Sequence, residues 1–103
     1  MKLYHNDLVY NTSIDKALGK WTFDTDENDT YYYEETLYLK RGLRLYYLYG
    51  KGGSTSKYAT EGKNGWQAGE AIIPLTDFGA EMWAKRKLGE KERERLFGKA
   101  VWK

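Results

Sequence analysis

The amino-acid sequence predicts an α+β fold: a small antiparallel sheet built on a central β-hairpin, with C-terminal helices packed on one face. Two runs rich in Tyr, Leu and Thr lie close together between residues 31 and 50, with a turn between them, which is typical of a hairpin. Along the whole chain, strand patterns come first and helical patterns come last. At 103 residues the chain is long enough for one core, and we expect a single domain over residues 1–103.

The central hairpin is expected to turn at Lys40-Arg41-Gly42. Glycine at the third position of a three-residue loop suits the left-handed residue of a type I turn followed by a G1 bulge. This loop places Leu37 opposite Leu45 on the face that we expect to be core. The other face, expected to be half solvated, then carries Tyr38, Arg44 and Tyr46.

The segment before the hairpin predicts a strand pair, a short helix and another strand. Leu3-Tyr4 and Leu8-Val9-Tyr10 are patterned like a short hairpin or a bent strand. Side-chain oxygens precede Ile14–Leu18 and Gly19 follows it, so this stretch predicts a helix of one to two turns. Trp21-Thr22-Phe23 alternates like a strand.

The segment after the hairpin predicts glycine-rich loops, one strand and two helices. Loops are expected at residues 50–56 and 62–69, followed by an apolar strand over Glu70–Leu75. Thr76 is the expected N-cap of the first helix, and Glu90–Phe97 predicts the second. The expected core residues are Trp21, Phe23, Leu37, Leu39, Leu45, Ile72, Leu75, Trp83 and Leu88.

Composition excludes several classes of protein. The chain has no cysteine, so a disulfide framework, a thiolate nucleophile and a cysteine-based zinc site are all excluded. Its first ten residues lack an apolar signal, and no stretch approaches the roughly 18 to 20 apolar residues of a membrane span. We therefore expect a cytoplasmic protein with no membrane partner, whose oligomeric state the sequence does not determine.

Charge is segregated along the chain. Acidic residues dominate residues 24–35, and basic residues dominate residues 40–63. The two segments either form oppositely charged faces that steer a partner, or neutralise each other across the hairpin. The basic residues of the second segment are Lys40, Arg41, Arg44, Lys51, Lys57 and Lys63.

Two motifs resemble ligand sites. Residues 24–29 resemble the start of a calcium loop, with Glu35 at its twelfth position, but Asp29 replaces the required glycine and strand patterns flank the loop. The glycine-rich stretch 50–57 does not match a nucleotide-binding P-loop. We expect no metal and no cofactor. An anion or a nucleic-acid backbone is the alternative ligand, with Lys51, Lys57 and Lys63 as candidate contacts.

The sequence does not predict an enzyme. His5 is the only histidine and there is no cysteine, so the familiar nucleophile–base pairs cannot be assembled except from Ser/Lys or carboxylate pairs. Glu34 and Glu35 are adjacent on an expected strand, so their side chains point to opposite faces and cannot act as a paired acid and base.

Tyrosine content indicates a binding surface. The chain contains ten tyrosines, and Tyr and Arg are enriched at the energetic centres of protein interfaces. The same side chains could stack on nucleic-acid bases, or the helices could simply cover them. The candidate protein-binding residues are Tyr32, Tyr38, Arg44 and Tyr46.

Three stretches between about Tyr10 and Phe97 carry a resemblance to a known family: Glu35-Thr36-Leu37-Tyr38, Gly50-Lys51-Gly52-Gly53 with Ser56-Lys57-Tyr58-Ala59, and Ile72–Thr76 followed by Ala80 and Trp83-Ala84. Together they resemble a family of small uncharacterised proteins of bacterial prophages and integrative elements, from which this chain departs in its hairpin loop and at Lys51. The resemblance implies a protein that binds and blocks host machinery, as anti-CRISPR inhibitors do. We therefore expect a non-enzymatic inhibitor of a host defence protein, with a nucleic-acid-binding accessory protein using residues 40–63 as the alternative.

Overall fold

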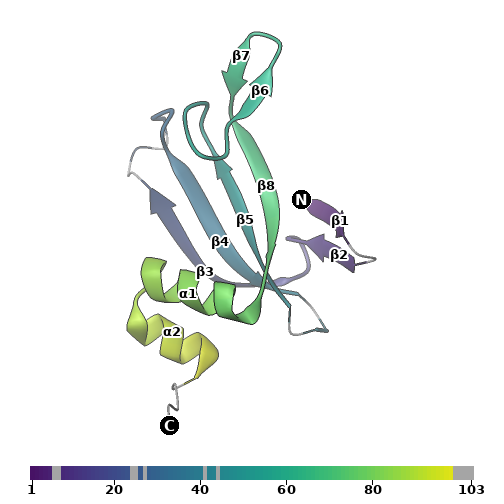
Figure 1. The fold of residues 1–103 in the computed structure, drawn as a ribbon, viewed down its shortest axis with the longest axis vertical. Helices are drawn as coiled ribbons and strands as arrows, with labels where there is room; N and C mark the ends of the chain where they lie inside the picture. Colours follow the sequence, from purple (N-terminus) through teal and green to yellow (C-terminus); the bar gives the residue numbers. More distant parts are fainter. Residues whose placement is uncertain (6–7, 24–25, 27, 41, 44, 99–103) are drawn as a thin grey trace.

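In a computed structural model of the chain, four antiparallel strands form one sheet, and two C-terminal helices pack on one of its faces (Figure 1). The structure describes residues 1–5, 8–23, 26, 28–40, 42–43 and 45–98. The predicted α+β fold, with its central hairpin and C-terminal helices, is confirmed. In sheet order the strands are β3 (Lys16–Phe23), β4 (Tyr33–Leu39), β5 (Tyr46–Gly52) and β8 (Gly69–Leu75), and the helices are α1 (Asp77–Lys87) and α2 (Glu90–Phe97).

Two small hairpins accompany the sheet. The first joins β1 (Lys2–His5) to β2 (Leu8–Asn11), which is one of the two predicted arrangements, and packs through Tyr10 against the sheet face opposite the helices. The second joins β6 (Thr60–Gly62) to β7 (Gly65–Gln67), where a glycine-rich loop was predicted, and projects from the far end of the sheet (Figure 1).

The register of the central hairpin differs from the predicted one. Leu37 lies opposite Leu48, three residues further along the chain than Leu45, and Leu39 lies opposite Tyr46. The loop is longer than predicted because the Lys40 N–H donates to the Leu45 carbonyl at 2.7 Å. A shift by an odd number of residues exchanges the two faces of a strand. Tyr46 and Leu48 therefore face the helices.

The helix predicted over residues 14–18 is wrong, because β3 begins at Lys16. The Asp15 carboxylate accepts hydrogen bonds from the Asn11 N–H at 2.9 Å and the Tyr47 hydroxyl at 2.8 Å. These bonds close a turn that leads into the sheet. Gly19 is not a helix terminus: a Cβ there would lie 2.5 Å from a methyl carbon of Leu88, so its lack of a side chain lets α1 approach the strand.

Both predicted C-terminal helices form. The Thr76 hydroxyl caps α1 by accepting from the Gly79 N–H at 3.0 Å. Arg93 joins the helices, because this buried α2 side chain donates to Glu81 of α1 at 2.8 Å and to Glu90 at the start of α2.

One core lies between the helices and the sheet, and a second, smaller core, which includes Ile72, lies beneath the N-terminal hairpin on the opposite face. Leu37, Ile72 and Trp83 are buried, as predicted. Phe23, in contrast, is 47% exposed, and Leu45 is only partly buried and packs into neither cluster of buried side chains found among the described residues. The other predicted core residues, Trp21, Leu39, Leu75 and Leu88, are partly buried and pack against the core.

The register predicts which leucines hold the fold together. We expect Leu48→Ala to cost roughly 2–5 kcal/mol of unfolding free energy, because it leaves a cavity opposite Leu37. Leu45→Ala should cost clearly less, because Leu45 lies in the loop. Urea unfolding of both variants measures the difference, and equal costs would instead favour the shorter loop that pairs Leu45 with Leu37.

Candidate functional site

The glycine-rich end of the sheet holds the candidate site. Here the β4–β5 pairing continues beyond both strands: the Gly53 N–H donates to the Tyr32 carbonyl at 2.9 Å, and the Thr55 N–H donates to the Thr30 carbonyl at 3.0 Å. A Cβ at Gly53 would lie 2.4 Å from the Thr30 carbonyl oxygen, so this close pairing requires glycine. Two hollows flank the paired segments.

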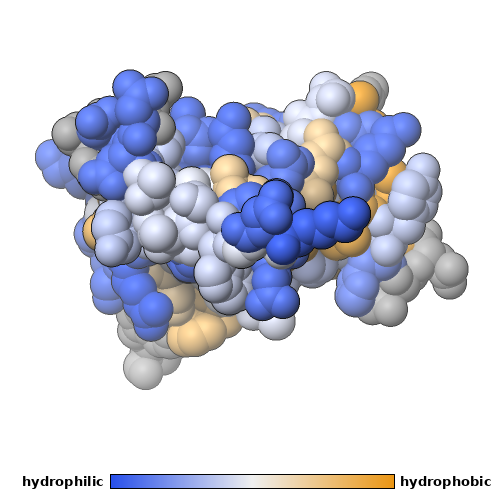
Figure 2. All heavy atoms as spheres, turned by 90° about the horizontal axis from the view of Figure 1, so that it is seen from above, coloured by the Kyte–Doolittle hydropathy of each residue, from blue (hydrophilic) through white to orange (hydrophobic). Residues whose placement is uncertain are grey.

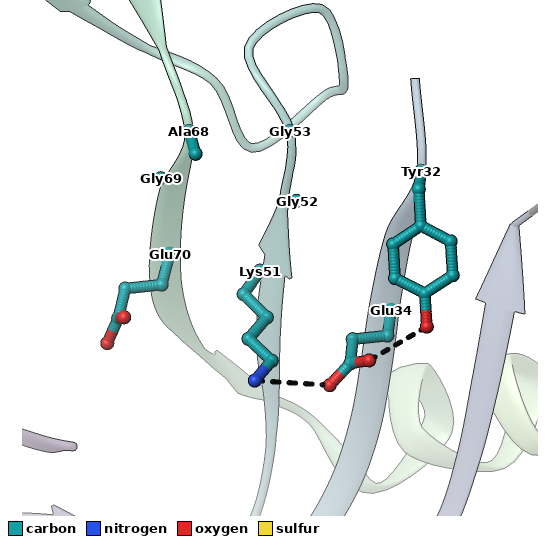
Figure 3. Close-up of a pocket in the computed structure, with 8 residues that line it drawn as sticks. All are labelled: Tyr32, Glu34, Lys51, Gly52, Gly53, Ala68, Gly69 and Glu70. Atoms are coloured by element: carbon teal, nitrogen blue, oxygen red, sulfur yellow. Dashed lines mark hydrogen bonds and ion pairs between the residues drawn. The ribbon is translucent and has the colours of Figure 1, made fainter. Parts of the chain in front are cut away.

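The first, which we call the polar hollow, has a volume of about 410 Å³ and lies on the sheet face opposite the helices (Figure 3). The hollow is open at its base because glycine and alanine, which have little or no side chain, line it beside the charged strand residues. Figure 3 shows Lys51 and Tyr32 both directed at the Glu34 carboxylate, whereas Glu70 points away from them. The lining residues are Tyr32, Glu34, Lys51, Gly52, Gly53, Ala68, Gly69 and Glu70.

Glu34 is the electrostatic centre of the polar hollow. The Tyr32 hydroxyl donates to its carboxylate at 2.9 Å, and the ammonium groups of Lys20 and Lys51 lie at 3.3 and 3.6 Å. Burial would raise the pKa of Glu34, but these hydrogen bonds and positive charges outweigh burial and lower the pKa below its ordinary value. Glu34 is therefore an ionised anchor for its neighbours.

The second hollow, the aromatic hollow, also has a volume of about 410 Å³, and none of the described residues that line it is charged. Tyr31 and Trp66 are 60% and 64% exposed. The Thr55 hydroxyl donates to the Thr30 hydroxyl at 2.7 Å, and the Ser56 hydroxyl donates to the Gly53 carbonyl at 2.8 Å, so both are already engaged. The lining residues are Tyr31, Ser54, Thr55, Ser56, Ala59 and Trp66.

Figure 2 looks onto this end of the molecule. Residues of intermediate hydropathy, in white and pale blue, lie among strongly hydrophilic residues in blue. Tyrosine and tryptophan belong to the intermediate group, because each combines an apolar ring with one polar atom. This end of the molecule is therefore a surface of mixed hydropathy.

The predicted protein-binding residues do not form one surface. Tyr32 lines the polar hollow, whereas Tyr38 lies further along the same face and stacks on Tyr47 at 5.2 Å. Tyr46 is only 7% exposed on the opposite face, where it packs against Phe97, so its predicted place beside Tyr38 is wrong. The shifted register is the cause. Arg44 lies outside the described residues.

The three lysines predicted to contact an anion are also separated. Lys51 pairs with Glu34 on one face, and Lys57 pairs with Glu35 at 3.0 Å on the other. Lys63 lies in the exposed turn between β6 and β7. These ion pairs correspond to the second predicted charge arrangement, in which the acidic and basic segments neutralise each other across the hairpin.

The sequence did not reveal the role of Glu35, which is 1% exposed. Its carboxylate accepts the Tyr58 hydroxyl at 2.5 Å and the Trp83 indole N–H at 2.8 Å, besides the pairing with Lys57. Burial would raise the pKa of Glu35, but the three donors outweigh it and lower the pKa. A Cβ at Gly50 would overlap the Tyr58 ring, so that glycine makes room for the cluster.

The calcium-loop motif therefore has its twelfth residue held in the core. Asp24 and Glu27 of that motif lie outside the described residues. Among the residues that the structure does describe, no three His, Asp or Glu side chains are placed to hold a metal ion, and no helix is long and apolar enough to cross a membrane.

No family model, curated protein or solved structure matches the chain. The site is therefore interpreted from its own geometry.

The Glu35 cluster predicts a loss of stability in acid. Because the pKa of Glu35 is lower in the folded chain than its ordinary value of 4.5, its contribution is present above about pH 4.5 and is lost as the pH falls through the folded-state pKa. Urea unfolding between pH 7 and pH 3 should show this fall. Glu35→Gln should cost about 1–3 kcal/mol at pH 7 and lose less stability than wild type on acidification. An equal loss in both proteins would contradict the assignment.

Proposed function

We propose that the protein is a non-enzymatic binding protein that docks against another protein through the aromatic hollow. The observation that carries the proposal is the exposure of two large aromatic side chains, Tyr31 and Trp66, around one uncharged hollow. Tryptophan and tyrosine are the residues most often found at the energetic centres of protein interfaces.

The chemistry of the hollow suits an apolar side chain of a partner protein. Two of its hydroxyls are engaged within the chain, by Thr30 and by the Gly53 carbonyl. Binding energy must then come mainly from covering apolar surface, at roughly 25 cal/mol per Å². Tyr32 and Lys51 line the neighbouring polar hollow, from which they would supply polar contacts to the same partner.

The nucleic-acid alternative has less support. Phosphate-driven binding requires several cations on one surface, whereas Lys51 and Lys57 lie on opposite faces and each pairs with a glutamate. One acidic residue also adjoins the aromatic hollow, because the Asp29 carboxylate accepts a hydrogen bond from the Tyr31 N–H at 2.9 Å. A nucleic-acid backbone would be repelled there.

The arrangement of the carboxylates supports a non-enzymatic role. Glu34 and Glu35 point to opposite faces of the sheet and are each held by several donors. The pKa of each is lowered, which makes each a poor general acid near neutral pH.

The class of partner that we propose follows from the resemblance to small prophage proteins. The protein would bind a host defence protein in the cytoplasm and block it by occlusion. The size of the molecule fits this role, because a chain of 103 residues can cover only one patch of a larger machine.

Alanine substitutions test the docking surface. Tyr31→Ala and Trp66→Ala should each weaken capture of a host protein by about 30-fold, which corresponds to about 2 kcal/mol, while changing stability by less than about 0.5 kcal/mol. The readout is a pull-down from host lysate, with the captured protein identified by mass spectrometry and its affinity then measured with purified proteins.

Tyr4→Ala is the matched control, because Tyr4 is 73% exposed and lies on the N-terminal hairpin. It should leave capture unchanged. Equal losses for all three variants, or capture that nuclease treatment abolishes, would sink the proposal.

A further inference from the structure

β3 is an edge strand with an unpaired outer side. It pairs only with β4, and Figure 1 shows it at the border of the sheet. Within the described part of the chain, residues 16–23 make no backbone hydrogen bond outside that pairing. An open strand edge is a template for pairing with another strand.

The other edge of the sheet, strand β8, is less suited to pairing with another strand. β8 contains Pro74, which has no N–H to donate. Ile72 of the same strand packs against the N-terminal hairpin through Tyr10. Among the residues that the structure describes, β3 is therefore the edge left open to a partner strand.

The regular part of β3 is short and well defined. A register shift interrupts the pairing with β4 between Ala17 and Gly19, whereas residues 19–23 pair without irregularity. The midpoint of this regular stretch is Trp21. An antiparallel partner that used all of it would place its own central residue opposite Trp21.

We propose that the partner is a second copy of this chain, paired antiparallel through β3 about a two-fold axis at Trp21. In this register Gly19 faces Phe23 of the copy, and Lys20 faces Thr22 of the copy. Opposed residues project from the same face of a sheet, so both contacts join like faces.

The contact on the helix face covers an exposed ring. Phe23 is 47% exposed. Leu88 lies directly over Gly19, where a Cβ would come within 2.5 Å of a Leu88 methyl carbon. Leu88 thus fills the space that a side chain at Gly19 would occupy, and Phe23 of the copy would pack against the outer side of Leu88.

The interface also extends an aromatic row. Phe23 stacks on Tyr33 with ring centroids 5.2 Å apart, and Tyr33 lies 5.9 Å from Tyr58. Trp21 lies 5.7 Å from Tyr33 and carries the Lys87 ammonium over its ring at 4.0 Å. Pairing through β3 would join the rows of both copies across one eight-stranded sheet.

The lysines select this register. Pairing centred on Lys20 would place Lys20 against itself, which like-charge repulsion disfavours. Pairing centred on Thr22 would leave most of the regular stretch unused, because β3 ends at Phe23. The register shift before Gly19 and the repulsion between the two Lys20 side chains therefore leave one register. In that register two copies form a closed dimer.

Dimerisation is tested separately from binding of a host protein, because molar mass is measured without any binding partner. Light scattering after size exclusion, between about 5 and 200 µM protein, should give twice the chain mass of 12.1 kDa. A monomer over this whole range would overturn the proposal.

A charge exchange tests the register. Thr22→Lys places lysine opposite Lys20 at both ends of the interface and should weaken the dimer roughly 100-fold. Adding Lys20→Glu to Thr22→Lys should restore it. Thr60→Lys, on exposed β6, is the matched control and should remain dimeric. Circular dichroism confirms that each variant folds.

Phe23→Ser gives a second test that does not alter charge, and it should also shift the equilibrium toward monomer. A dimer that survives both Thr22→Lys and Phe23→Ser, or a double variant that stays monomeric, would place the interface elsewhere.

Discussion

The fold depends on one buried carboxylate. Glu35 lies at the centre of the sheet and accepts hydrogen bonds from Tyr58 in the loop after β5 and from Trp83 in α1. Burying a charge is costly unless it is paired and hydrogen-bonded, and here three donors meet it. The donors come from two segments that pack on the hairpin, the loop after β5 and α1. The cluster therefore fixes how the helix layer and the glycine-rich loop sit on the strands.

A second constraint is that β5 is buried on both faces. Tyr46 and Leu48 pack under the helices, whereas Tyr47 packs beneath the N-terminal hairpin against Tyr10 and Tyr38. This explains the tyrosine content. Many of the tyrosines fill this second small core. It covers the sheet face opposite the helices, which would otherwise be exposed to solvent.

The fold class followed from the sequence because the pattern was strong. The hairpin runs, the apolar strand ending at Leu75 and the Thr76 cap all carry local signals that tertiary contacts reinforce. The hairpin register did not follow, because a plausible turn at Gly42 competed with a longer loop, and only packing on both faces of β5 decides between them. The predicted position of Tyr46 on the half-solvated face is wrong for the same reason, because it depends on that register.

The glycines of residues 50–53 show how composition can mislead. They give the stretch the look of a flexible linker, yet a Cβ at Gly50, Gly52 or Gly53 would lie within 2.4 Å of another atom of the chain. Tyr58, Ser56 and the Thr30 backbone occupy that space. In terms of mutational tolerance, this segment is among the least permissive in the molecule, and sequence drift in related chains should spare these glycines while it changes the charged residues around them.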